Sequence, residues 1–127
     1  MTSSIRGSIL LADDEEKILK RLGRALRDEG HEVVETTSAK GAQRQLGEKS
    51  FDLLVVDNVM PGMTGLELAA HLADQDASLP VILMSAHAFD PPAGSRWTFV
   101  QKPFDPADLL EHVRRALHGT VAAAPSA

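Results

Sequence analysis

The chain has 127 residues, of which 43% are hydrophobic and 24% are charged, and its formal net charge is −5. This length suits one globular domain with a single core. The acidic balance argues against nucleic-acid binding by this chain, and the absence of cysteine excludes disulfides, thiolate catalysis and Cys-based zinc sites.

No export signal or membrane segment is evident in the sequence. The first residues, MTSSIRGS, lack the apolar core of a signal peptide, and no apolar run approaches the roughly 18 residues of a membrane span. We therefore expect a cytoplasmic protein.

The first half of the chain alternates between strand and helix patterns. Residues 8–14 (SILLADD) form a continuous apolar run, which is typical of a central strand covered on both faces. Residues 15–30 have apolar positions at helical spacing and end on a glycine, which favours helix termination. Residues 31–37 predict a second strand. Residues 38–50 predict a weaker helix, with Ser38 as its N-cap.

The second half repeats this alternation. Residues 51–58 (FDLLVVDN) and 80–86 (PVILMSA) are two further continuous apolar runs, and a helix is predicted between them from about residue 65 to 75. Residues 98–103 (TFVQKP) predict a short strand. Residues 105–117 predict a last helix that opens with Asp-Pro, an N-cap followed by a residue suited to the first helical position.

Polar side chains close or follow four of these predicted strands. The alternation itself predicts right-handed βαβ crossovers and an α/β fold with a doubly wound parallel sheet. In such sheets ligands bind at the carboxyl ends of the strands. The residues at these ends are Asp13, Asp14, Asp57, Ser85 and Lys102. We expect their side chains to meet at one edge of the sheet.

The chemistry of these side chains points to phosphoryl transfer. Three neighbouring carboxylates repel one another unless a cation is present, and hard oxygen ligands favour Mg²⁺. Lys102 adds a positive charge suited to a phosphoryl group, and the Ser85 hydroxyl can donate to a phosphoryl oxygen. Together they predict a site at which a carboxylate oxygen of Asp57 attacks a phosphoryl group in line.

Four motifs in the chain resemble those of the receiver domains of bacterial two-component response regulators. They are ILLADDEE, VVDNVMPGMTGLEL, VILMSA and FVQKPF, and they occur in the family's order at the ends of the corresponding strands. The resemblance covers nearly the whole chain. It implies a five-stranded sheet in the flavodoxin-like order 2-1-3-4-5. It also implies a receiver domain over residues 1–119, followed by a flexible tail or the start of a linker over residues 120–127.

The resemblance also implies roles for the acidic residues. Asp57 matches the phosphoacceptor of the family. Asp14 matches a direct metal ligand, and Asp13 matches a ligand that acts largely through water. Val59 would supply a backbone carbonyl to the same Mg²⁺ ion.

Further roles concern the response to phosphorylation. Ser85 matches the hydroxyl residue that follows the phosphoryl group, and Lys102 matches the lysine that pairs with it. Phe99 is in the place of the family's switch aromatic. The Lys102–Pro103 peptide is in the place of a bond that is typically cis.

Structural alternatives remain open for several of these residues. The acidic pair could cap the first helix, and Lys102 could be a solvated surface charge. Phe99 could be an ordinary core aromatic. His87 could border the site or lie on the surface without a role.

Two features depart from the family's pattern. The connection AHAFDPPAGSRW, residues 86–97, is close to the minimum of roughly ten to twelve residues for a crossover, and its prolines and glycine disfavour helix. We predict at most about one helical turn where the family has its fourth helix, and therefore an altered output face. The second departure is Asn58, where the family usually has an apolar residue.

The sequence thus predicts a phosphorylation-controlled switch. A sensor histidine kinase or phosphotransfer protein would donate the phosphoryl group, and the response would act on an output domain or partner protein, or through a homodimer. The chain would catalyse only its own phosphorylation and dephosphorylation. One alternative is a pseudo-receiver, a docking module that is never phosphorylated. Another is a magnesium-dependent hydrolase, a class that usually has a second acid where Val59 stands.

Overall fold

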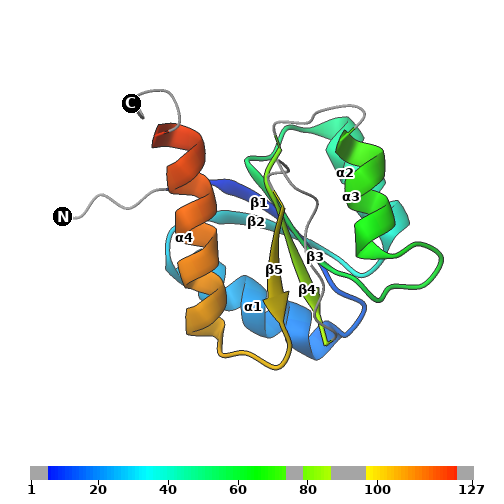
Figure 1. Cartoon of the computed structure of the whole chain (residues 1–127), viewed down its shortest axis with the longest axis horizontal. Helices are drawn as coiled ribbons and strands as arrows, with labels where there is room; N and C mark the ends of the chain where they lie inside the picture. The colour runs from blue at the N-terminus through cyan, green and yellow to red at the C-terminus, as the bar shows by residue number, and fades with distance from the viewer. Residues whose placement is uncertain (1–5, 74–78, 87–96, 123–127) are drawn as a thin grey trace.

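The computed structural model describes residues 6–73, 79–86 and 97–122, in which a five-stranded parallel sheet lies between two layers of helices (Figure 1). The strand order is β2-β1-β3-β4-β5, as the resemblance implied. The strands are β1 Ser8–Ala12, β2 Glu32–Thr36, β3 Leu53–Asp57, β4 Val81–Ser85 and β5 Trp97–Gln101. The helices are α1 Glu16–Asp28, α2 Ala39–Glu48, α3 Gly65–Ala73 and α4 Pro106–Ala122. Each lies where the sequence predicted it, with bounds that differ by a few residues.

Neighbouring residues of the central strands enter opposite cores. In β1, Ile9 and Leu11 pack with α1 and α4, whereas Leu10 and Ala12 pack with α2 and α3, the two helices on the other face of the sheet (Figure 1). Every residue of β3 and β4 is buried. This two-sided burial is what continuous apolar runs predict. Packing on both faces therefore holds the ends of β3 and β4 in place.

The helix ends follow from local chemistry. Gly30, after α1, has a φ of 98°, a left-handed conformation that glycine adopts readily. Ser38 caps α2, and its hydroxyl accepts an amide hydrogen bond from the first turn at 3.0 Å. The last helix begins at Pro106, and the Asp108 carboxylate accepts a hydrogen bond from the Asp105 amide at 3.3 Å. The predicted glycine terminator and the Ser38 cap are confirmed, and Asp105 stands directly before the first residue of α4, where the N-cap was predicted.

Some predictions fall on parts of the chain that are not described. β4 ends at Ser85 and β5 begins at Trp97, but residues 87–96, for which we predicted at most one helical turn, lie outside the described residues. Helix α4 is the last of the described helices and not this crossover helix. It is described as far as Ala122, and the division into domain and tail at residue 119 stays a prediction. None of the described helices has both the length and the apolar character needed to cross a membrane.

Candidate functional site

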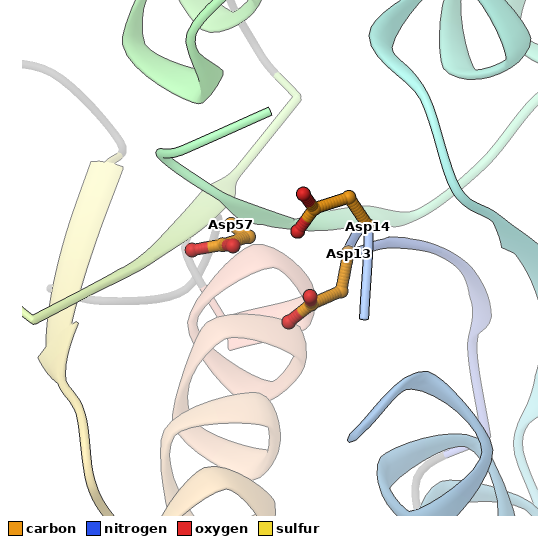
Figure 2. A group of neighbouring side chains, drawn as sticks. All are labelled: Asp13, Asp14 and Asp57. Carbon is orange, nitrogen blue, oxygen red and sulfur yellow. The ribbon is translucent and has the colours of Figure 1, made fainter. Parts of the chain in front are cut away.

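Three carboxylates meet at the carboxyl ends of β1 and β3. Asp57 is the last residue of β3, and Asp13 and Asp14 directly follow β1. Their carboxylates lie near one another, and one oxygen from each lies within 4.8 Å of the others (Figure 2). Asp13 is fully buried and Asp57 is 5% exposed, whereas Asp14 is exposed to solvent. The cluster is therefore open on the side of Asp14 and closed beneath the other two residues.

Lys102 brings the one cation that contacts this cluster among the described residues. It follows β5, and its Nζ lies 3.1 Å from Oδ2 of Asp13 and 3.4 Å from Oδ1 of Asp57. Its backbone amide donates to the carbonyl of Ser85 at 2.8 Å, which ties the end of β5 to the end of β4. The Lys102–Pro103 peptide is cis, as the resemblance implied. The alternative of a solvated surface charge does not hold for Lys102.

The electrostatics of the site favour a bound cation. Burial raises the pKa of Asp57, and the neighbouring charge of Asp13 raises it further. Lys102 and a hydrogen bond from the Val59 backbone lower the Asp57 pKa only in part. Burial alone would lower the pKa of Lys102, but its hydrogen bonds and charge interactions with Asp13 and Asp57 outweigh burial and raise it. Lys102 therefore stays charged, yet one ammonium does not balance the buried acids.

The acidic set fits a hard divalent ion. It offers three carboxylates within reach of a single ion and contains neither sulfur nor imidazole. Mg²⁺ prefers oxygen ligands of this kind and retains several waters on its open side. The exposure of Asp14 provides that open side.

The remaining candidate residues lie around the cluster in different ways. Ser85 ends β4 and is 2% exposed, beside the strand that carries Asp57. Phe99 pairs in register with Leu83 in the middle of β5 and is partly buried. Because side chains alternate along a strand, Leu83 and Ser85 point to the same face, and Phe99 lies on that face beside them. The Val59 side chain is 62% exposed, so only its backbone belongs to the site.

Sequence reasoning gave one neighbouring residue no role. Asn58 is tied to the start of α3, because its side-chain Oδ1 accepts from the Leu66 amide at 2.9 Å and its carbonyl accepts from the Gly65 amide at 2.9 Å. The only signal in the sequence was its departure from the family's pattern. Gly65 permits this closure, since a Cβ on it would lie 2.7 Å from the carbonyl oxygen of Asp57.

Comparison with known proteins identifies the class to which the fold and this site belong. The family model of the response regulator receiver domain matches residues 9–114, so the chain is a member of that family. Among solved structures, a CheY-like response regulator receiver domain protein from Methanospirillum hungatei JF-1 is similar with a TM-score of 0.83 and 26% identity. That match covers 91% of this chain and 97% of the other.

Three further relatives are informative. The response regulator TrrA of Thermotoga maritima, solved in complex with Mg²⁺ and BeF, is similar with a TM-score of 0.76 and 27% identity over 86% of this chain and 97% of its own. The DNA-binding transcriptional regulator NtrC of Bradyrhizobium sp. (strain RP501 Parasponia) is 36% identical over 87% of this chain, which spans 24% of that protein. The transcriptional regulatory protein YkoG of Bacillus subtilis (strain 168) is 32% identical over 88% of this chain and 51% of its own length. The chain thus spans between a quarter and a half of these two curated relatives.

Proposed function

We propose that this receiver domain is a phosphorylation switch whose acceptor is Asp57. The observation that carries the proposal is the contact of one ammonium, that of Lys102, with both Asp57 and the fully buried Asp13. A buried acid pair is unfavourable in a folded chain unless cations compensate it. Such a cluster would be used by a metal ion and a phosphoryl group that bind together: the acids would bind the ion, and the ammonium would contact the phosphoryl group.

In the proposed reaction an oxygen of Asp57 attacks the phosphorus of a phosphohistidine on a sensor kinase or phosphotransfer protein. A P–O bond forms, the P–N bond breaks, and the electron pair stays on the imidazole of the donor. Asp13, Asp14 and Asp57, with the backbone carbonyl of Val59, would hold Mg²⁺. When bound, this ion supplies positive charge that stabilises the transferring phosphoryl oxygens.

The residues around the acceptor then have separate tasks. Lys102 would shift from the carboxylate of Asp57 to an oxygen of the new phosphoryl group, since its ammonium already lies at that carboxylate. Ser85 would donate its hydroxyl to another phosphoryl oxygen from the end of β4. Phe99, on the same face of the sheet, would change its packing as Ser85 moves. A change in population from 1:99 to 99:1 requires about 5.5 kcal/mol of preference for the active state, more than one hydroxyl contact supplies.

The partners follow from the class of protein. We propose a sensor histidine kinase or phosphotransfer protein as donor, and an output domain or separate partner as target. The curated relatives of greater length support an output domain. A homodimer, the lack of direct nucleic-acid contact by this domain and a cytoplasmic location stay predictions from the sequence.

The test is intact mass after incubation with Mg²⁺ and a small phosphodonor. We expect the native chain to gain the mass of one phosphoryl group and Asp57→Asn to gain none. An unmodified native chain would favour the pseudo-receiver alternative. Equal labelling of both proteins would show that the acceptor is another residue.

A further inference from the structure

We propose that Asn58 is a positioning residue that orients the peptide between itself and Val59 by fastening it to the first turn of α3. The inference rests on the proposed function, because this peptide adjoins both the acceptor Asp57 and the proposed metal ligand. The residue itself touches neither the phosphoryl group nor the ion.

A single planar peptide joins Asn58 to Val59. The carbonyl of Asn58 accepts a hydrogen bond from the Gly65 amide at 2.9 Å. The other end of the same planar unit is the Val59 amide, which faces Asp57 and lowers the pKa of that carboxyl. In a trans peptide the carbonyl and the amide point in opposite directions. One rigid plane therefore stands between the start of α3 and the carboxylate of Asp57.

The Asn58 side chain is also tied to α3. Its Oδ1 accepts from the Leu66 amide at 2.9 Å, so Asn58 receives hydrogen bonds from the first two residues of α3. The helix does not need Asn58 for its capping box. Thr64 Oγ1 already accepts from the Glu67 amide at 3.0 Å, and Glu67 Oε1 accepts from the Thr64 amide at 2.9 Å. The bond from Leu66 thus serves chiefly to hold the loop against the helix.

The Val59 side chain provides no anchor for its own backbone. It is 62% exposed and cannot fix that backbone by packing. On the C-terminal side of Val59, Met60 is 7% exposed and anchored in the core with α2 and α3. On the N-terminal side of Val59, the two hydrogen bonds between Asn58 and α3 provide the second anchor. The direction of the Val59 carbonyl, the proposed metal ligand, is set between these two anchors.

The experiment compares Asn58→Ala with Thr64→Ala. Both variants remove one side-chain acceptor for an amide in the first turn of α3, but only Asn58→Ala removes one of the two hydrogen bonds that hold the peptide beside Asp57. Mg²⁺ binding is measured by calorimetry on the folded chain. We expect Asn58→Ala to bind Mg²⁺ about fivefold more weakly, which corresponds to the loss of one ordinary hydrogen bond, and Thr64→Ala to bind as the native chain does.

Amide hydrogen exchange gives a readout that does not depend on the metal. The Val59 amide should exchange faster in Asn58→Ala and remain slow in Thr64→Ala. Asn58→Asp keeps an acceptor for the Leu66 amide and should restore slow exchange at Val59. Unchanged exchange and Mg²⁺ affinity in Asn58→Ala, or equal changes in Thr64→Ala, would overturn the inference.

The outcomes separate this inference from the proposed function. A native chain that binds Mg²⁺ but is never labelled would refute the phosphoacceptor role, while a weaker affinity of Asn58→Ala would still support the positioning role. A labelled native chain whose Mg²⁺ affinity is unchanged by Asn58→Ala would refute the positioning role alone. A native chain that binds no Mg²⁺ would overturn both.

Discussion

The two ends of the sheet are held together by different means. At the amino ends of the strands, Asp52 accepts from the Ser8 amide at 2.8 Å, and His31 Nδ1 accepts from the Gly7 amide at 3.1 Å. Each of these side chains satisfies one backbone group and is at least partly exposed. At the carboxyl ends, two buried carboxylates share the Lys102 ammonium.

The difference shows which end is built for a ligand. At the amino end, each side chain accepts one hydrogen bond from a backbone amide where a strand begins. The carboxyl end concentrates acids whose repulsion opposes folding, and burial in a low-dielectric site strengthens that repulsion. A cation bound at this end would relieve the repulsion.

The largest expected effect comes from Lys102→Met. Removing the ammonium leaves the fully buried Asp13 without its cation, and breaking a buried pair from one side costs about 3 kcal/mol. Urea unfolding without metal should show this loss. Added Mg²⁺ should stabilise the variant more than the native chain, since the ion replaces the missing charge.

The matched control is Lys20→Met, on an exposed position of α1. It should change the free energy of unfolding by no more than about 0.5 kcal/mol. If Lys102→Met were as stable as this control, the charges at the carboxyl end would not be coupled as described.

A smaller effect of opposite sign is expected from Asp57→Asn. The pKa of Asp57 is raised by burial and by Asp13, so the charged form is disfavoured in the folded state. At neutral pH without metal the variant should unfold at a higher urea concentration than the native chain. The native chain recovers this deficit as the pH falls through the raised pKa of Asp57, and the difference vanishes below its ordinary value of 3.8.

Asp52→Asn is the corresponding control at the amino end. It keeps an acceptor for the Ser8 amide and should unfold close to the native midpoint at neutral pH. A native chain more stable than Asp57→Asn under these conditions would mean that the acidic cluster stabilises the fold. That result would contradict the claim that the acids at the carboxyl end of the sheet oppose folding.

The smallest effect concerns His31. Burial lowers its pKa; Glu29 opposes this shift and Arg114 adds to it. A lowered histidine pKa contributes stability above 6.5 that is lost as the pH falls through the folded-state pKa. Between pH 7 and pH 5 the native chain should therefore lose more stability than His31→Gln in urea titrations. Parallel loss in both proteins would refute this contribution.

The sequence predicted the parts of the molecule that depend on local pattern. The apolar run of β3 predicted a buried central strand, and the position of Asp57 at its end followed directly. The strand-end rule brought Asp13, Asp57 and Lys102 together because parallel strands end at one edge of a sheet. These predictions needed no knowledge of how loops pack.

The sequence could not predict the parts that depend on loop closure. It did not show which member of the acidic pair is buried, because that depends on how the chain turns after β1 and on the Asp13 Oδ1 that accepts from the Glu15 amide at 2.9 Å. The role of Asn58 depends on a hydrogen bond to Leu66, eight residues later, which exists only once the loop has closed. Both features are set by tertiary geometry.

The most direct test of Asp57 as the phosphoacceptor is to locate the phosphoryl group on the native chain. After phosphorylation in Mg²⁺, reduction of the acyl phosphate with borohydride converts the modified aspartate to homoserine, which peptide mass mapping can place. We predict homoserine at position 57 and at no other aspartate. Homoserine at position 13, 14 or 52, or none at all in a chain that binds Mg²⁺, would contradict the assignment of Asp57 as the acceptor.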